Sequence, residues 1–258
     1  MDPLSLLLGA LSGVLVGFSL GLVGGGGSIL AVPLMVYVVG IDNPHVAIGT
    51  SAIAVAANAA LNLANHARRG NVRWRCAAVF AAAGVVGAYG GSSLGKAVDG
   101  QALLLAFAVL MLVVGGLMLR GSGAGGDAEP RLDRGNAPRL LGFGTMAGAL
   151  SGFFGIGGGF LIVPGLVAAT GMSMLLAIGS SLVAVTAFGL TTALNYASSG
   201  LIDWAVAAVF IGGGLLGGLG GAALATRLSA SRGALNKVFA ALIFVVAAYM
   251  IHQGLLAL

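Results

Sequence analysis

The chain has 258 residues, of which 59% are hydrophobic and only 7% are charged, and 46 are glycines. Because a soluble domain carries about a quarter charged residues, this composition excludes an ordinary soluble protein and predicts an all-α integral membrane protein embedded in a lipid bilayer. The net charge of +5 does not indicate a nucleic-acid partner, since excess Lys and Arg in cytoplasmic loops is usual for membrane proteins.

Ten apolar segments follow one another in two groups of five. We interpret residues 1–119 as a first transmembrane repeat, residues 120–139 as a cytoplasmic linker rich in Gly, Pro and charge, and residues 140–258 as a second repeat. The predicted segments of the first repeat are residues 4–23, 28–40, 46–67, 76–93 and 102–119. Those of the second repeat are residues 140–155, 159–170, 175–197, 204–224 and 236–256. Most of them approach the ~20 apolar residues that a helix needs to cross a bilayer.

The two groups are copies of one unit. GGGGSILAVP at residues 24–33 returns 131 residues later as GIGGGFLIVP at residues 155–164. Further along the chain, Gly-Thr-Ser at residues 49–51 returns as Gly-Ser-Ser at residues 179–181. Paired units with glycine-broken hydrophobic segments at matching positions are typical of transporters whose site lies between the units.

The basic residues indicate how the repeats are oriented. Of the 12 Lys and Arg residues, all except Lys96 lie in residues 68–75, 120–139 and 227–237. If these three regions are cytoplasmic, both termini are periplasmic or extracellular. The loop that matches residues 68–75 in the second repeat, residues 198–203, contains no basic residue. This opposite bias, with five segments per unit, predicts repeats of inverted topology.

The second segment of each repeat is short. Residues 28–40 would span only ~20 Å as a helix. The first two segments of each repeat can therefore form a re-entrant hairpin or a helix broken at the glycines, and the sequence leaves open whether the second segment spans the membrane or re-enters. Both arrangements, the re-entrant hairpin and the broken helix, leave the predicted orientation of the later segments unchanged.

The glycine runs are the first candidate for a binding site. Broken backbone at membrane depth is tolerated where it is buried in protein or lines a polar cavity, and a helix that starts after such a break aims unpaired N–H groups at an anion. Close helix packing is the alternative reason for small residues. The candidate substrate-binding residues at the two breaks are Gly26, Gly27, Ser28, Gly158, Gly159 and Phe160.

Polar side chains on the third and eighth segments are the second candidate. Thr50, Ser51, Ser180 and Ser181 stand near the starts of these segments, where hydroxyls either cap a helix or donate to substrate oxygens. Asn65 and Asn195 stand near the far ends as further candidate substrate-binding residues, with a structural role as the alternative. Asn58 and Asn62 belong to the same third segment, and all these amides are expected to point inward, because an amide facing lipid is costly.

Other chemistry has little support in the sequence. No Asp, Glu, Lys or Arg falls convincingly at mid-membrane, which argues against a relay of buried carboxylates. His45, His66 and His252 stand near segment ends and are expected to be interfacial. With a single cysteine, Cys76, and no nucleophile–base pair, the chain is not expected to be an enzyme. We predict no catalytic residue, no metal ligand and no cofactor.

The sequence resembles the TauE/SafE sulfite exporters, also called sulfite exporter/toluene-sulfonate uptake permeases. The likeness is carried by GLVGGGGSILAVPLM at residues 21–35 and AIGTS at residues 47–51. In the second repeat it is carried by GFFGIGGGFLIVP at residues 152–164 and AIGSS at residues 177–181. Nearly the whole chain apart from the central linker takes part.

This resemblance implies secondary transport of a small sulfur-containing anion, such as sulfite, thiosulfate or the organosulfonate sulfoacetate, across a bacterial inner (cytoplasmic) membrane. Export by alternating access is the expected direction and mechanism. The alternatives are an anion channel, an uptake permease for sulfur compounds or another small organic anion, and a structural membrane scaffold. Glycine-rich helix faces fit a homo-oligomer as well as packing within one chain, so the oligomeric state stays open.

Overall fold

The computed structural model describes residues 3–120, 135–157, 159–228 and 244–253, and every regular element in these ranges is helical. The predicted all-α class is therefore confirmed. Within the described residues, five helical stretches are long and apolar enough to cross a membrane. Shorter apolar helices accompany them, among them Leu161–Thr170 and Phe244–Gln253.

The first half begins with a long helix and then a break. α1 spans Pro3–Val23, a 3-10 helix η1 follows at Gly24–Leu30, and α2 spans Ala31–Tyr37. The remaining helices of this half are α3 (Pro44–Arg68), α4 (Trp74–Ala97) and α5 (Gly100–Arg120). The predicted third segment, residues 46–67, thus lies within two residues of the observed bounds of α3.

The second half repeats this order. Its helices are α6 (Ala137–Phe154), α7 (Gly159–Thr170), α8 (Met174–Ala197) and α9 (Trp204–Leu228). Of the predicted linker, residues 121–134 lie outside the described residues, and the part from Ala137 onward is already helical. Of the predicted last segment, residues 236–256, only residues 244–253 are described, and they are helical.

The chain reverses direction at both glycine breaks. Gly24 has a φ of +67°, a conformation that favours glycine and ends α1. After the turn, a β-carbon at Gly27 would lie 2.3 Å from the backbone nitrogen of Leu20, so η1 folds back along the end of α1. α2 has only 7 residues, which span ~10 Å, so it does not cross the membrane by itself.

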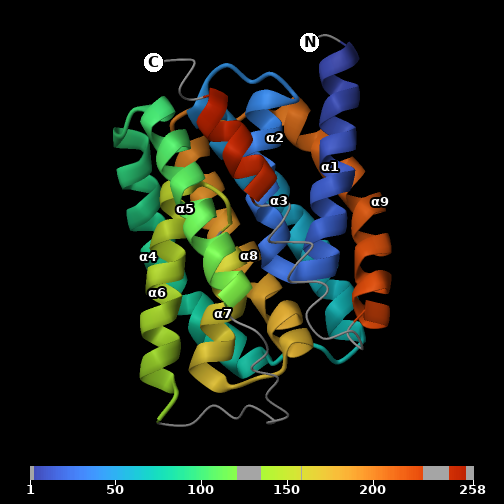
Figure 1. The fold of residues 1–258 in the computed structure, drawn as a ribbon, viewed down its shortest axis with the longest axis vertical. Coiled ribbons are helices and arrows are strands. Elements are labelled where there is room, and N and C mark those ends of the chain that lie inside the picture. Colours follow the sequence, from blue (N-terminus) through green and yellow to red (C-terminus); the bar gives the residue numbers. More distant parts are fainter. Residues whose placement is uncertain (1–2, 121–134, 158, 229–243, 254–258) are drawn as a thin grey trace.

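Gly155 and Gly157 break the second half in the same way, with φ values of +69° and +66°. Figure 1 shows that α1 starts at the upper end of the bundle and α6 at the lower end. The loop from α2 to α3 lies at the end where α1 starts, and the turn from α7 to α8 lies at the end where α6 starts. Each half thus opens with a hairpin, and the two hairpins enter from opposite ends.

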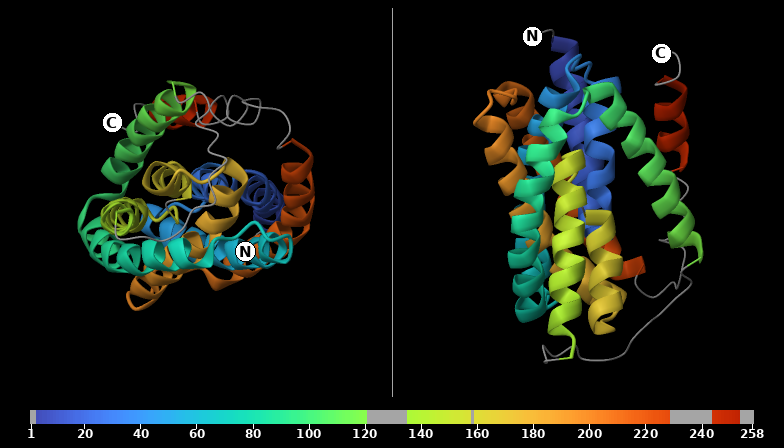
Figure 2. Two further views of the ribbon diagram at one scale, coloured as in Figure 1. Left: turned by 90° about the horizontal axis from the view of Figure 1, so that it is seen from below. Right: turned by 90° about the vertical axis from the view of Figure 1, so that its left-hand side faces the viewer.

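The helices pack in matching pairs. α1 lies along α9 and α4 lies along α6, while α3 and α8 pack against each other between these pairs. α5 and the helix at residues 244–253 lie along one edge of the bundle (Figure 2). A β-carbon at Gly17 would lie 2.1 Å from the carbonyl oxygen of Gly214, and one at Gly148 would lie 2.0 Å from that of Gly84. Glycine is therefore needed where the paired backbones touch.

Candidate functional site

The two breaks meet at the centre of the bundle. A β-carbon at Gly159 would lie 1.7 Å from the carbonyl oxygen of Gly25, and one at Gly25 would lie 2.4 Å from the Cα of Gly159. A β-carbon at Gly157 would touch Val55 and Val185, which belong to α3 and α8. The start of α7 and the η1 segment are therefore in backbone contact, between the two central helices.

Two buried serines hold the first break. The Gly25 N–H donates a hydrogen bond of 3.1 Å to Ser181 Oγ. That hydroxyl donates in turn to the carbonyl of Ile178 at 2.7 Å. Ser28 Oγ donates to the Gly25 carbonyl at 2.8 Å. Ser28 and Ser181 are both fully buried. The structure thus brings together candidate residues from both halves.

Ser51 occupies the corresponding place at the second break. Its Oγ donates to the Ile48 carbonyl at 2.9 Å and approaches the Gly155 carbonyl at 3.5 Å. Ser181 accepts from the backbone of the first break, whereas Ser51 approaches the backbone of the second break as a donor. Ser181 and Ser51 therefore occupy matching positions at the two breaks but make different hydrogen bonds.

Thr50 and Ser180 make a matched pair of bonds elsewhere. Thr50 Oγ1 accepts from the backbone N–H of Asp203 at 2.9 Å, and Ser180 Oγ accepts from that of Arg73 at 2.8 Å. Asp203 and Arg73 directly precede α9 and α4. Each hydroxyl therefore ties one central helix to the turn at the start of a helix in the other half.

The two asparagines share no hydrogen bond with the serines within the described residues. Asn65 and Asn195 are each 14 residues beyond the serine of their own helix, about 21 Å along that helix. The end of α8 nevertheless lies beside the start of α3, because a β-carbon at Gly49 would lie 3.0 Å from Tyr196 Cβ. Asn195 Oδ1 accepts from Lys96 Nζ at 2.8 Å, and its Nδ2 donates to Ser92 Oγ at 2.6 Å and Ser93 Oγ at 3.0 Å. Asn195 therefore bonds to residues of α4 and not to Ser51 or Ser181.

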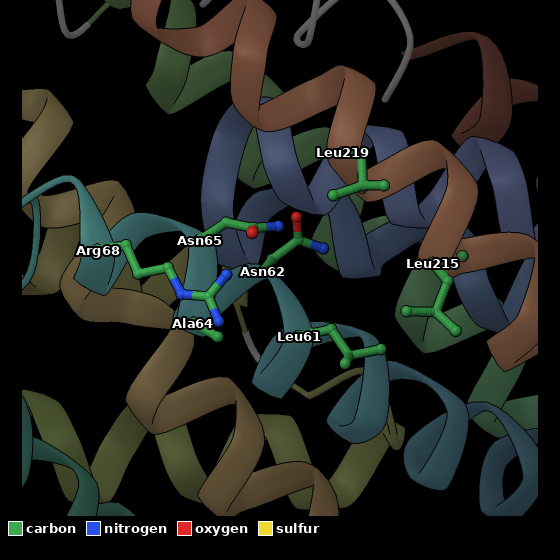
Figure 3. Close-up of a pocket in the computed structure, with 9 residues that line it drawn as sticks. Leu61, Asn62, Ala64, Asn65, Arg68, Leu215 and Leu219 are labelled. Atoms are coloured by element: carbon green, nitrogen blue, oxygen red, sulfur yellow. The ribbon is translucent and has the colours of Figure 1, made fainter.

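Asn65 lies instead in a groove between α3 and α9. Figure 3 shows Asn62, Asn65 and Arg68 pointing into the same space from α3, with Leu215 and Leu219 on the α9 side. The leucines are partly exposed, so the groove opens at the outside of the bundle. It is a second polar region, separate from the contact between the breaks.

The remaining candidate residues belong to the glycine runs. Gly26 and Gly27 are buried in η1, and Gly159 is buried at the start of α7. Gly158 and the side chain of Phe160 lie outside the described residues. Candidate donors at the centre are thus backbone N–H groups and hydroxyls. Such neutral donors suit an anion, and because Ser28, Ser51 and Ser181 are fully buried, helices must move to admit one.

The position of one histidine differs from the expectation. His66 was expected at the membrane interface but is fully buried, with Nε2 3.1 Å from the Gly21 carbonyl of α1. Asn58 and Asn62 are buried as expected. With His66 they stand at i, i+4 and i+8 of α3, a spacing that places them on one helix face. That spacing was the signal that could have identified His66 as an inward-facing residue.

Comparisons with known proteins agree with this architecture. The sequence matches the family described as "Sulfite exporter TauE/SafE" over residues 9–250. A "Probable membrane transporter protein" of Xylella fastidiosa (strain 9a5c) is 55% identical over 251 residues, covering 97% of this chain and 96% of the relative. A similarly named protein of Methanocaldococcus jannaschii is 29% identical over 162 residues, covering 58% of this chain and 59% of that protein.

No solved structure matches the chain. The family match spans nearly all of the sequence, and the Xylella fastidiosa protein aligns almost end to end. The chain therefore belongs to the TauE/SafE sulfite exporter family of membrane transporters.

Proposed function

We propose that this protein is a secondary transporter of a small sulfur-containing anion, such as sulfite, thiosulfate or an organosulfonate like sulfoacetate. The proposed direction is export across a bacterial cytoplasmic membrane. The observation that carries the proposal is the backbone contact between Gly25 and Gly159, beside the buried hydroxyls of Ser28, Ser51 and Ser181. The family description supports the substrate class, and neutral donors at a helix break support an anion.

The proposed mechanism is alternating access between inverted repeats. α1 and α6 start at opposite ends of the bundle, which supports inversion (Figure 1). Under the repeat relation α1 corresponds to α6 and α9 to α4, so the pairs α1–α9 and α4–α6 are equivalent contacts. Rocking one pair against the other around α3 and α8 would open the centre to each side in turn. The arginine-rich turn before α4 would then be cytoplasmic, and both termini periplasmic.

The proposed anion site consists of residues at the two breaks together with Ser51 of α3 and Ser181 of α8. Thr50 and Ser180 act as positioning residues, because they hold the turns before α9 and α4. Asn65 and Asn195 share no hydrogen bond with these residues within the described part of the chain, and would contact the anion only on its path. The residues assigned to the site are Gly26, Gly27, Ser28, Ser51, Gly158, Gly159, Phe160 and Ser181.

The proposal is tested with the purified full chain in proteoliposomes. Vesicles loaded with unlabelled sulfite are diluted into radiolabelled sulfite, and parallel samples use thiosulfate, sulfoacetate, taurine and chloride. A carrier gives transient, saturable accumulation of label that empty liposomes lack. Single-channel currents without saturable exchange would instead indicate an anion channel. If none of the sulfur anions is exchanged or protects the protein from thermal unfolding, the proposed function is wrong.

A further inference from the structure

A column of unsatisfied polar atoms runs along the buried face of α3. It consists of Asn58, Asn62 and His66, which are 0%, 1% and 0% exposed. Both amide atoms of Asn58, the Oδ1 of Asn62 and the Nδ1 of His66 have no hydrogen-bond partner within the described part of the chain. Buried polar atoms are nearly always paired in native proteins, with protein groups, water or a ligand, so these atoms have room for a partner outside the chain.

The hydrogen bonds of His66 and Asn62 show which of their atoms carry a hydrogen and which are free acceptors. His66 Nε2 lies 3.1 Å from the Gly21 carbonyl, an acceptor, so Nε2 carries the ring hydrogen and Nδ1 carries a lone pair. Asn62 Nδ2 donates to the Asn58 carbonyl at 3.0 Å, so its Oδ1 is also a free acceptor. Residues four apart are neighbours on a helix face. Two acceptors therefore stand side by side, and one proton on Nδ1 would turn the ring into a donor.

A groove lies beside these atoms, although α9 packs closely on them. Gly214 and Gly218 of α9 face the column, and a β-carbon at Gly214 would lie 2.1 Å from Asn58 Nδ2. The groove between α3 and α9 is lined by Asn62 and both glycines, and it continues to Arg68 at the end of α3 (Figure 3). Asn62 lines the groove but is only 1% exposed, so a small displacement of α9 would open a route for water and protons from the groove to the column.

The second repeat carries different side chains at the matching positions. The residues 130 positions after Asn58, Asn62 and His66 are Phe188, Thr192 and Tyr196. All three are fully buried on the corresponding face of α8. Thr192 Oγ1 and Tyr196 OH also have no hydrogen-bond partner within the described residues. None of the three side chains on α8 carries a basic nitrogen, so the base belongs to the first half alone, as a single coupling site would.

We propose that His66 and Asn62 form a proton-binding site that couples anion transport to proton movement. This inference rests on the proposed function. A proton from water in the groove attaches to Nδ1 while Nε2 keeps its hydrogen on the Gly21 carbonyl, and the new N–H donates to Asn62 Oδ1, directly or through one water. No other bond forms or breaks, and the proton returns to water when the site reopens.

Charge links this site to the anion. His66 bonds to Gly21, one turn before the break at Gly24, so protonation places a positive charge close to the proposed anion site. Arg69, directly after α3, is the cation that acts on His66. A bound anion offsets the repulsion between these two charges, so anion and proton favour each other's binding. The site then carries one proton with each anion.

The other elements packed on α3 contribute few charges. Among the described side chains, α1, α5 and α9 carry no titratable group. α2 carries Tyr37 and α8 carries Tyr196, while α3 carries His45 and Arg68, and Arg69 directly follows it. None of these is a carboxylate, so the anion is the negative partner available to a protonated His66.

The test uses the full chain in lipid nanodiscs with isotope-labelled histidine. The nitrogen resonances of His66, identified by their loss in His66→Gln, are followed from pH 8 to pH 5 by nuclear magnetic resonance. We expect Nδ1 to become protonated toward the acidic end of this range, because burial and the nearby Arg69 both oppose a positive charge on the ring. Asn62→Leu should reduce the protonated fraction at pH 6 severalfold, because the ring loses its acceptor. Thr192→Leu, the same change at the matching position of α8, and His252→Gln, at an exposed site, should leave it unchanged.

A second arm adds sulfite or thiosulfate at pH 6. Each anion that protects the protein from thermal unfolding should raise the protonated fraction of His66, and Asn62→Leu should weaken that effect. A ring that stays in the neutral Nε2–H form throughout, as a water-filled site would give, overturns the proton site. Titration that Asn62→Leu does not affect overturns the role of the pair.

The two proposals fail in different ways. An anion that protects the protein, or is exchanged in liposomes, without changing His66 protonation overturns the coupling while the transporter stands. If none of the sulfur anions binds or is exchanged, the transporter proposal fails and the coupling fails with it. In that case the titration without anion still decides whether His66 and Asn62 bind a proton.

Discussion

The backbone N–H of Gly25 donates a 3.1 Å hydrogen bond to the hydroxyl of Ser181, which lies 156 residues away in the sequence. This contact joins the break in the first half of the chain to the central helix of the second half. It is fully buried, so any motion that opens the centre must break it or carry both residues together. Weakening this contact should therefore destabilise the closed structure and make the proposed anion site easier to reach.

Removing the Ser181 hydroxyl should cost more stability than removing that of Ser51. Ser181→Ala leaves the Gly25 N–H buried without an acceptor, at a cost of about 1–3 kcal/mol. Ser51→Ala is the matched control. The Ser51 hydroxyl donates to the carbonyls of Ile48 and Gly155, so its removal leaves no buried N–H without an acceptor. Thermal unfolding of both variants in the same detergent measures the difference. Equal midpoints would show that the Gly25 bond contributes nothing.

The contact between the two breaks should not tolerate a methyl group. Gly159→Ala places a β-carbon 1.7 Å from the Gly25 carbonyl oxygen, which forces the broken segments apart. Overpacking of this kind costs about 1–3 kcal/mol or more. Gly90→Ala in α4 is the control, since nothing lies within 4 Å of its β-carbon. Unfolding midpoints should fall for Gly159→Ala and stay level or rise for Gly90→Ala; a tolerated Gly159→Ala would contradict the close contact.

Lys96 should stabilise the end of α8 without taking part in anion binding. Its ammonium group donates to the Asn195 carbonyl, Asn195 Oδ1 and Ser199 Oγ at 2.8–2.9 Å. Lys96→Met should lower the unfolding midpoint by an amount corresponding to about 1–3 kcal/mol, because a partly buried carbonyl and amide lose their donor. Arg75→Met, at an exposed arginine, is the control and should have little effect. Anion affinity measured by thermal protection should be the same in both variants.

The hydroxyls of Thr50 and Ser180 should act as caps between the two halves. Thr50→Val and Ser180→Ala each remove an acceptor from the N–H before α9 or α4, which typically costs about 0.5–2 kcal/mol. Hydrogen exchange at Asp203 should then accelerate in Thr50→Val, and exchange at Arg73 should accelerate in Ser180→Ala. Unchanged exchange at either amide would mean that the cap does not protect that turn.

The sequence predicted the helices and the breaks because these features are local. Apolar length defined α3 and α8 to within two residues, and the glycine runs identified the reversals after α1 and α6. The positive φ at Gly24 and Gly155 explains why glycine recurs at these positions. Local pattern is sufficient here, because a membrane helix needs a fixed apolar length and a left-handed residue favours glycine.

The hydrogen bonds of the candidate site could not be predicted in the same way. The partners of Thr50 and Ser180 lie 153 and 107 residues away, so no spacing within one segment indicates them. His66 was misplaced because its position near the end of α3 resembles an interface position. The fold buries it beneath α1, where its Nε2 lies 3.1 Å from the Gly21 carbonyl, a contact between helices that no spacing within α3 indicates.

The most direct test of the central claim is counterflow of radiolabelled sulfite by the double variant Ser51→Ala/Ser181→Ala. Wild type and variant are reconstituted at equal density, after unfolding curves confirm that both are folded. If the anion binds between the glycine breaks, wild type accumulates label in a saturable way and the variant does so at least about tenfold more slowly, since two donors to an anion are lost. Equal rates in the two proteins would contradict a site at these serines.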